Sequence, residues 1–430
     1  MRRAPAGAAA TVCTRLCLGW ASWRSHDNVY LSQNPPESPR LPEPLTHERR
    51  LQQALLRWES ATGPASFATE VAGELSHKSL NVEYEFLEDR GKSRIRAHLD
   101  GTCTPLDEPV GLDPVAIAKP WGQELWYTGI EDRGESRVAT QSGSLPISAY
   151  LDLAPNLLCQ RQPIVLLKIL DPKPEPVVGE LYLEAHASKH EVYVVTALDQ
   201  RAWPDGVGAI RMGINQALRR EFSSDQAFRD AYRATVQAYE RVRRGIDDGR
   251  LHGAAATAEE RLAREAMNRF TNILPLRVGD IVSVPPWLPH SLQNGVRVVE
   301  FQTPTYERFI ISFAQRVVTQ AHWDSDYAIA HINLEPPAAA ATEVIAPGIC
   351  QIANLGDFRA WRIEIAAKQT LTLPVKLPYA VCIGLTGTIS INGLARLPEQ
   401  ACFVPSSALP LTIANPSTTP ASALVASTPT

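Results

Sequence analysis

The stretch Leu181–Leu198, LYLEAHASKHEVYVVTAL, holds two histidines, two glutamates and a lysine within eight consecutive residues. Glu184 and His186 lie two residues apart on a run of strand-forming residues, so their side chains point to one face of that strand. The β-branched run after Glu191 predicts a second strand. We expect residues 187–189 to form the turn of a hairpin that returns Glu191 to the first two side chains. The pattern indicates half of a metal site.

A further ligand comes from a distant stretch. Gly279–Gly295, GDIVSVPPWLPHSLQNG, places His290 after a strand that prolines end. Imidazoles combined with carboxylates suit zinc or another borderline divalent ion, with a coordination position left for water or substrate. We predict that Glu184, His186, Glu191 and His290 hold one divalent ion, with zinc as the first choice and iron, manganese and nickel as alternatives.

Both stretches resemble the two signatures of the cupin barrels, and further motifs narrow the resemblance to the type I mannose-6-phosphate isomerases, or phosphomannose isomerases. The motifs follow the order of that family over residues 112–330. They are KPWG (119–122) followed by ELW, LLKILD (166–171), RVGD (277–280) followed by VPP, and EFQ (300–302) followed by TYER (305–308). The chain resembles a divergent member of that family.

The resemblance and the local patterns together predict a mainly β fold with an α-helical insertion, built as a bicupin. The predicted parts are a disordered or targeting-like tail and linker (1–45), an N-terminal α+β extension (46–112), a metal-binding cupin (113–204 and 273–335), a helical insertion (205–272) and a degenerate C-terminal cupin (342–430). Apolar residues at three- and four-residue spacing predict helices over 213–222, 223–245 and 257–270. We expect the last dozen residues, rich in serine, threonine and proline, to fray.

Composition excludes several classes of partner. With 44% hydrophobic and 20% charged residues, the 430-residue chain has ordinary globular composition. A net charge of −4 gives no reason to expect nucleic acid or an acidic membrane as partner. The seven cysteines are scattered without paired spacing and fit a reducing compartment. We expect a cytoplasmic protein with a small-molecule ligand.

The resemblance also assigns substrate-handling residues. Lys168 and Lys189 match the family's pocket lysines, Arg308 matches its active-site arginine, and Glu300 is a candidate base. On this assignment Lys168 and Lys189 bind a sugar phosphate, while Arg308, Lys189 and Glu300 act at the reacting centre. Glu184 is a departure, because the family has glutamine there.

Other departures lie at the substrate end of the site. Leu292 stands where the family has tyrosine, the loop before Arg308 lacks an aspartate, and an insertion between His186 and Lys189 is missing. The resemblance implies an aldose–ketose isomerase that acts on a sugar phosphate such as mannose 6-phosphate through a cis-enediol. The departures leave two alternatives, which are a non-catalytic sugar- or metal-binding cupin and a different cupin enzyme such as an iron-dependent oxygenase.

Overall fold

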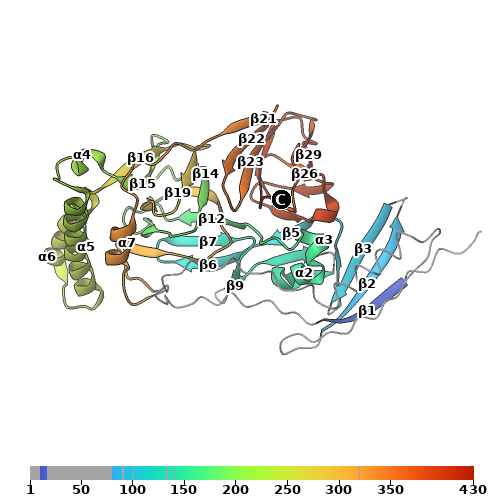
Figure 1. The fold of residues 1–430 in the computed structure, drawn as a ribbon, viewed down its shortest axis with the longest axis horizontal. Helices are drawn as coiled ribbons and strands as arrows, with labels where there is room; N and C mark the ends of the chain where they lie inside the picture. The colour runs from blue at the N-terminus through green and yellow to red at the C-terminus, as the bar shows by residue number, and fades with distance from the viewer. Residues whose placement is uncertain are drawn as a thin grey trace, which may run out of the picture.

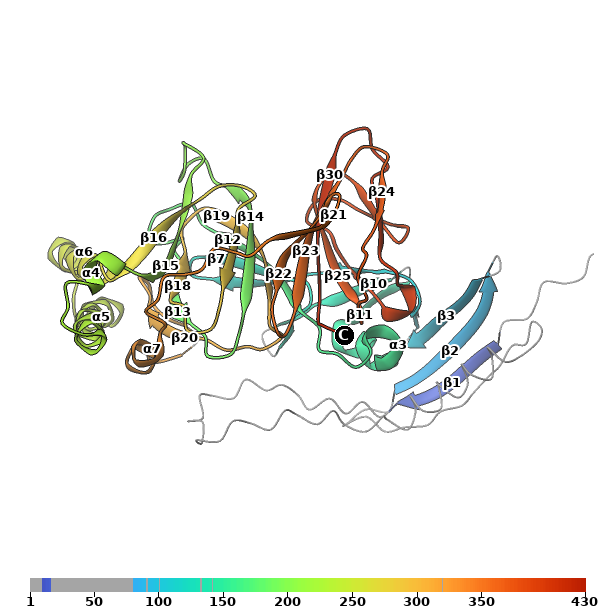
Figure 2. The same cartoon turned by 45° about the horizontal axis from the view of Figure 1, so that its top comes forward.

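The fold is mainly β and consists of stacked antiparallel sheets, with most of the helices at one end (Figures 1 and 2). The structure is a computed structural model, and it describes residues 10–16, 80–89, 92–99, 101–131, 134–140, 142–318 and 320–430. Among these residues, no helix combines the length and apolar composition that a bilayer crossing needs.

Two sheets enclose the segment that the sequence singled out. A six-stranded sheet has the order β17-β14-β19-β12-β7-β6, with β6 Val115–Lys119, β7 Gly122–Trp126, β12 Leu166–Pro172, β14 Glu191–Leu198, β17 Ile281–Val284 and β19 Val296–Gln302. A five-stranded sheet has the order β16-β15-β18-β13-β20, with β13 Leu183–Ala185, β15 Gly208–Ile214, β16 Thr271–Leu276, β18 His290–Leu292 and β20 Phe309–Ser312. Tyr193 and Val298 from the first sheet share one core with Ile210 and Leu292 from the second, so the sheets pack face to face.

The predicted hairpin is wrong. β13 pairs with β18 and β20, whereas β14 pairs with β17 and β19, so residues 187–190 cross from one sheet to the other. The physical reason is burial on both faces of β14. Tyr193 and Val195 pack into the core between the two sheets, and Val192 and Val194 pack into a second core on the opposite side.

Helices cover the outer face of the five-stranded sheet. They are α4 Gln216–Arg219, α5 Asp225–Asp247, α6 Gly253–Asn268 and α7 Ser325–His331. Phe228 and Tyr232 of α5 pack on Leu183 and Ile311 of the sheet.

The predicted helix boundaries need correction. β15 takes residues 208–214, so only the short α4 remains of the helix predicted over 213–222. α5 begins after Ser224 as predicted, because the Ser224 side chain accepts a hydrogen bond from the Ala227 amide at 3.1 Å. α6 begins at Gly253, four residues before its predicted start, and the side chain of its N-cap residue His252 makes no capping hydrogen bond. α7 was not predicted.

A second pair of sheets forms the C-terminal part. The nine-stranded sheet has the order β11-β10-β5-β28-β25-β30-β23-β22-β21, with β5 Val110–Asp113, β10 Arg137–Thr140, β11 Gly143–Pro146, β21 Glu343–Ala346, β22 Ile349–Asn354, β23 Arg359–Ile365, β25 Ala380–Thr386, β28 Ala401–Val404 and β30 Ala421–Ser427. The four-stranded sheet has the order β24-β29-β26-β27, with β24 Thr370–Thr372, β26 Ile389–Ile391, β27 Leu394–Arg396 and β29 Thr412–Ala414, and the 3₁₀ turn η1 is Ser406–Ala408. Trp361 and Ile391 belong to the core between these sheets.

Two features of the nine-stranded sheet differ from expectation. β5, β10 and β11 precede the metal stretch in sequence but pair with the C-terminal strands through β28. The predicted fraying of the last dozen residues is wrong for β30, which lies between β25 and β23 and is buried along its whole length. Its small residues, ASALVAS, fit between two packed layers.

The remaining face of the six-stranded sheet packs on the nine-stranded sheet. Val192, Val194 and Phe301 of the former share a core with Ala360 and Phe403 of the latter. The layers therefore follow the order helices, five-stranded sheet, six-stranded sheet, nine-stranded sheet and four-stranded sheet.

An N-terminal sheet joins the same core from the side (Figure 2). Its order is β1-β2-β3-β4, with β1 Ala10–Leu16, β2 Leu80–Asp89, β3 Lys92–Leu99 and β4 Thr102–Pro105. Tyr84 donates a hydrogen bond to the Leu153 carbonyl at 2.6 Å and so joins the sheet to α2. The adjoining elements are α2 Ile147–Leu153, α3 Pro155–Cys159 and the β8–β9 ribbon, Ile130–Glu131 with Gly134–Glu135. β1 lies in the predicted tail, and residues 46–79 of the predicted N-terminal extension lie outside the described residues.

Candidate metal centre

The five-stranded sheet brings two predicted ligands together by its register. Glu184 on β13 is the antiparallel partner of His290 on β18, although 106 positions separate them in the chain. Directly paired residues have Cβ atoms about 4.5–5.5 Å apart. His186 follows β13 on the same face, and its ring centroid lies 4.8 Å from that of His290. Candidate ligand atoms of Glu184, His186 and His290 all lie within 4.8 Å of one another.

Glu191 reaches the same point from the facing six-stranded sheet. It is the first residue of β14 and lies on the same face of that strand as Tyr193, which packs between the sheets, so its carboxylate projects into that space. Oε1 lies 3.8 Å from Nε2 of His186, and Oε2 lies 3.3 Å from Nε2 of His290. The structure therefore brings together all four side chains that the sequence proposed as metal ligands.

The two imidazoles differ in their partners. Both ring nitrogens of His186, a residue that is 0% exposed, are without a hydrogen-bond partner in the described part of the chain. Nδ1 of His290 lies 2.9 Å from the Leu288 carbonyl, and a hydrogen bond donated there leaves Nε2 free to accept a metal ion. A buried imidazole without a partner is costly unless another group satisfies it, and a cation between Glu184, Glu191 and the two rings does so.

The charges at this point favour a cation. Burial lowers the pKa of His186 to about 4, with help from Lys189, so the ring is neutral and able to bind metal at pH 7. Burial alone would raise the pKa of Glu184, but its contacts with His186 and Arg308 lower it to about 2. Burial likewise opposes ionisation of Glu191, yet Lys189 and the histidines hold its pKa well below the usual range. Two buried carboxylates thus stay ionised beside two imidazoles.

Two neighbours fix the orientation of Glu191. The Lys189 ammonium lies 2.6 Å from Oε1, and the Tyr193 hydroxyl donates to Oε2 at 2.5 Å. Tyr193 is two residues beyond Glu191 on β14, which puts both side chains on one face of the strand. Tyr193 was not predicted as a site residue, although this spacing was available in the sequence.

A second charged group lies beside the centre, on β12 and β19. Lys168 is the register partner of Glu300, and its ammonium lies 3.7 Å from Glu300 Oε1 and 2.6 Å from Gln302 Oε1. Burial raises the pKa of Glu300 to about 8, although Lys168 opposes this effect. Glu124, whose Oε2 accepts a hydrogen bond from the Trp126 indole at 2.6 Å, completes this group from β7. Neither Gln302 nor Glu124 was predicted as a site residue, although both belong to quoted motifs.

Arg308 closes the site from the segment before β20. Its guanidinium lies over the Tyr182 ring at 4.5 Å, and Nε lies 3.7 Å from Glu184 Oε2. Nearby, Glu307 accepts a hydrogen bond from the Ser188 hydroxyl at 2.7 Å and so ties down the segment between His186 and Lys189. Glu307 was not predicted as a site residue, although it belongs to the quoted TYER motif.

The charged side chains of the site line one pocket of about 440 Å³ including its open mouth. Its walls carry three cations and five carboxyl groups, together with aromatic and aliphatic side chains. The charged members are Lys168, Lys189, Arg308, Glu124, Glu184, Glu191, Glu300 and Glu307.

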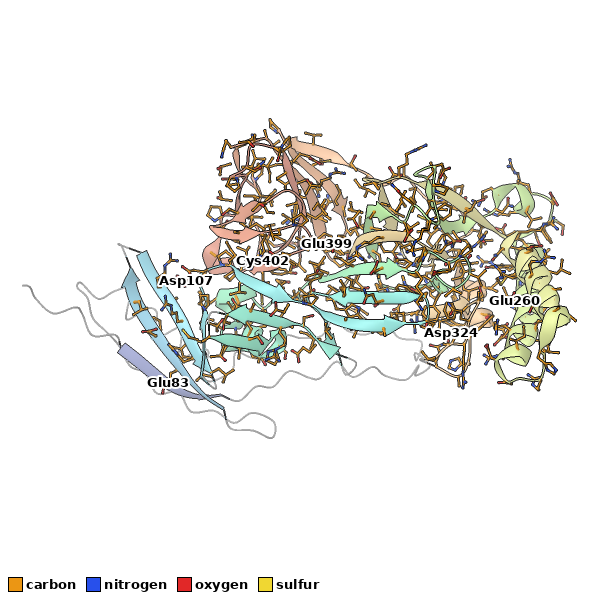
Figure 3. The ribbon with its side chains drawn as sticks, turned by 180° about the vertical axis from the view of Figure 1, so that it is seen from behind. Glu83, Asp107, Glu260, Asp324, Glu399 and Cys402 are labelled. Carbon is orange, nitrogen blue, oxygen red and sulfur yellow. The ribbon has the colours of Figure 1, made fainter. Side chains whose placement is uncertain are left out.

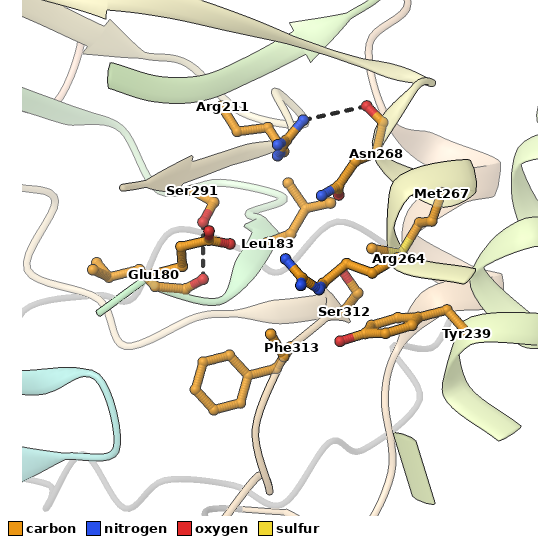
Figure 4. Close-up of a pocket in the computed structure, with 12 residues that line it drawn as sticks. Glu180, Leu183, Arg211, Tyr239, Arg264, Met267, Asn268, Ser291, Ser312 and Phe313 are labelled. Carbon is orange, nitrogen blue, oxygen red and sulfur yellow. Dashed lines mark hydrogen bonds between the residues drawn. The ribbon is translucent and has the colours of Figure 1, made fainter. Parts of the chain in front are cut away.

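Another pocket lies between the five-stranded sheet and the helices (Figure 4). Arg211 of β15 donates to the Asn268 carbonyl at 3.2 Å, and Arg264 of α6 projects into the same space. None of the predicted site residues lines this pocket. The chemistry that the sequence indicated therefore belongs to the space between the two sheets.

Comparisons with known proteins point to one fold. No family model and no curated protein matches the chain. A variant of phosphomannose isomerase from Salmonella typhimurium matches with a TM-score of 0.58 and 10% identity, covering 75% of this chain and 100% of that chain. A second variant of that enzyme matches with a TM-score of 0.57 and 12% identity, covering 75% and 99%. A zinc-bound mannose 6-phosphate isomerase matches with a TM-score of 0.57 and 10% identity, covering 75% and 100%. The fold of this chain is similar to that of phosphomannose isomerase.

Proposed function

We propose that this chain is a bicupin, metal-dependent aldose–ketose isomerase that acts on a sugar phosphate of the mannose 6-phosphate type. The observation that carries the proposal is the meeting of Glu184, His186, Glu191 and His290. Glu184 and Glu191 also line a pocket that holds two lysines and an arginine. The similarity of the fold to phosphomannose isomerase supports the same assignment.

The four side chains fit a divalent ion of zinc's class. His186 offers a neutral imidazole whose Nε2 lies 3.5 Å from Glu184 Oε1, and His290 has its Nδ1 engaged by the backbone, which is the usual arrangement for a metal-binding histidine. When bound, such an ion supplies positive charge that polarises oxygens on the first two sugar carbons. Iron, manganese and nickel remain alternatives to zinc, because a second carboxylate at Glu184 suits them as well.

Proton transfer between the first two sugar carbons falls to Glu300. A general base needs a pKa near the working pH, and burial raises the pKa of Glu300 to about 8. The carboxyl therefore populates both protonation states near neutrality, so it can accept a proton from one carbon and return it to the next. Arg308 and Lys189 lie across the same pocket, where they stabilise negative charge that develops on the sugar oxygens.

Lys168 binds the phosphate group of the substrate in this proposal. Its buried ammonium lines the pocket, and an ammonium binds phosphate as a point charge.

A non-catalytic sugar- or metal-binding role is the second candidate, and one observation favours it. Both lysines already have partners within the chain, since Lys189 lies 2.6 Å from Glu191 and Lys168 lies 2.6 Å from Gln302. Five carboxyl groups in one pocket also oppose a dianionic ligand. A phosphate must therefore compete with internal contacts for each ammonium.

A coupled assay of the zinc-loaded chain on mannose 6-phosphate tests the proposal. We expect turnover that a chelator abolishes, and an Arg308→Gln variant that keeps its metal while kcat falls roughly a hundredfold to a thousandfold. The exposed Arg316 provides the matched control, Arg316→Gln, which should keep full activity. Binding of mannose 6-phosphate without turnover by the unmutated chain would establish the second candidate. Oxygen consumption with an iron-loaded chain would favour the oxygenase.

A further inference from the structure

A second set of metal-ligating side chains lies far from the pocket, on the N-terminal sheet. Glu85 on β2, His98 on β3 and Cys103 on β4 occupy three adjacent strands. His98 is the register partner of Cys103 on one side and of Glu83 on the other, and Glu85 follows Glu83 on the same face of β2. Figure 3 shows Glu83 on this sheet.

This face of the sheet is not part of the apolar core. The alternate residues Val82, Tyr84 and Phe86 of β2 are buried, whereas Glu85, His98 and Cys103 are half-buried. A strand reverses its side chains at each residue, so the three ligating groups project together on the side away from the core.

The distances among the three groups match a coordination shell. Nε2 of His98 lies 3.3 Å from Glu85 Oε2 and 3.8 Å from Cys103 Sγ. All three candidate ligand atoms lie within 4.8 Å of one another. Ligands bound at 2.0–2.3 Å to a tetrahedral ion lie about 3.3–3.8 Å apart, so a small rotation of Glu85 or Cys103 closes the set.

We propose that Glu85, His98 and Cys103 bind a divalent ion of zinc's class, with water in the fourth position, and that this ion ties β2, β3 and β4 together. A thiolate, an imidazole and a carboxylate are the three side-chain ligand types that zinc prefers. The site has no ligand in common with the centre between the five-stranded and six-stranded sheets, so the proposal stands apart from the proposed isomerase function.

Metal binding here includes loss of a proton. Burial raises the pKa of the Cys103 thiol, and although the Arg96 guanidinium opposes this, Glu85 adds to it. The thiol therefore holds its proton at pH 7, and a bound cation displaces that proton as the metal–sulfur bond forms. Binding should weaken as pH falls.

Cobalt(II) tests the proposal, because of the two proposed sites this one has a sulfur ligand and the other does not. The full chain, kept reduced, is titrated with cobalt(II) and followed by metal content and by the thiolate-to-cobalt charge-transfer band in the near ultraviolet. We expect two ions per chain and the band. His290→Ala should bind one ion and keep the band, and Cys103→Ser should bind one ion and lose it. Cys350→Ser, at a half-buried cysteine outside the site, should behave as the unmutated chain.

Two results would overturn the proposal. One is a cobalt-saturated chain without the charge-transfer band, which would leave the three residues as a hydrogen-bonded group only. The other is a band that persists in Cys103→Ser, which would place the sulfur ligand elsewhere. Should Cys103→Ser fail to fold, His98→Gln carries the same comparison, with loss of one ion and of the band as the expected result.

Discussion

The pairing of Glu184 with His290 across neighbouring strands is the residue-level feature on which the candidate metal centre depends. Backbone hydrogen bonds fix this pair before any ion binds, and Glu191 approaches from a separate sheet that a shared core holds in place. The ligand geometry is therefore a property of the sheets, and we expect the chain to keep this geometry without an ion.

Replacement of His290 tests this arrangement. We expect His290→Ala to lose metal at the centre, with affinity at least about tenfold weaker, while the chain stays folded at a cost of about 1–3 kcal/mol for the lost buried side chain. Metal content and circular dichroism are the measurements. His252→Ala, at an exposed histidine, is the control. Unchanged metal content would remove His290 from the ligand set, and an unfolded variant would show that the ion is structural.

Replacement of Lys168 tests the phosphate assignment. Loss of a charge-assisted contact in a partly dry site costs about 1.5–3 kcal/mol, so Lys168→Met should weaken binding of mannose 6-phosphate roughly ten- to a hundredfold. Binding of mannose itself should change little. Calorimetry on both sugars measures this, with Lys376→Met at an exposed lysine as control. Equal losses for both sugars would mean that Lys168 acts through Glu300 and Gln302 instead of on the phosphate.

Asp152 in α2 gives a pH-dependent prediction that does not involve the pocket. Burial, together with Glu135, raises the pKa of Asp152 to about 8, and its Oδ1 has no hydrogen-bond partner among the described residues. The unfolded pKa is about 3.9, so the folded chain holds this proton more tightly and loses stability as pH rises from about 4 to 8.

Asp152→Asn cannot ionise and should remove that loss. At pH 8 we expect the variant to be more stable than the unmutated chain, by an amount on the order of a few kcal/mol, with little difference at pH 4. Denaturant unfolding at both pH values measures the effect. Asp113→Asn, at an exposed aspartate, is the control. A variant that is equally destabilised at both pH values would show that the carboxyl has an unrecognised partner.

Sequence spacing predicted the ligand residues but not how they meet. Glu184, His186 and Glu191 are close in the chain, so any compact fold keeps them near one another. The predicted hairpin between them was wrong, because the strand partners of β13 lie about a hundred residues later in the chain and local sequence does not encode them. Tyr193 was within reach of the same reasoning. Glu307 lies in the quoted TYER motif, but its contact with Ser188 depends on the fold.

At the level of elements, α5 shows where local sequence suffices. Its apolar period and its Ser224 cap identified the helix directly. β30 shows the opposite case. Its small and polar residues predict a frayed terminus, and only its pairing with β23 and β25 makes it a buried strand. The sheet to which β5, β10 and β11 belong is likewise determined by pairing with β28, which lies far away in the sequence.

The cap of α5 can be tested directly. Ser224→Ala removes the hydrogen bond to the Ala227 amide and should destabilise the helix by about 0.5–2 kcal/mol. Amide exchange at Ala227 should become faster, while exchange in the nine-stranded sheet should not change. Ser223→Ala, at an exposed neighbour whose side chain is not the cap, is the control. Equal effects from both variants would show that the cap contributes nothing.

At the level of the whole molecule, the two pairs of sheets share the core that contains Val194, Phe301 and Phe403. An ion pair also joins them, since Arg297 contacts Glu399 at 3.0 and 2.9 Å, and Figure 3 labels Glu399. Exposed ion pairs contribute at most about 1 kcal/mol, whereas burial of one large apolar side chain contributes about 1.5–3 kcal/mol. The apolar core should dominate the contact.

A shortened chain tests that conclusion. Residues 1–335 alone would expose Val192, Val194 and Phe301 and leave β5, β10 and β11 without β28 as a neighbour. We expect this chain to aggregate, as measured by size-exclusion chromatography. Glu399→Gln in the full chain removes only the ion pair. This variant should elute without aggregates, as the unmutated protein does. A folded, dispersed chain of residues 1–335 would contradict the dominance of the shared core.

The first five residues of β14, 191–195, are buried on both faces of the strand. Glu191 and Tyr193 point into the pocket, and Val192 and Val194 point into the core shared with the C-terminal sheets. Substitutions of Glu191 and Tyr193 should therefore damage ligand binding. Substitutions of the intervening residues Val192 and Val194 should damage the packing of the six-stranded sheet on the nine-stranded sheet. Among relatives of this chain, the strand should be one of the slowest to accumulate neutral change, and a saturation scan across it should show two interleaved patterns of intolerance instead of one.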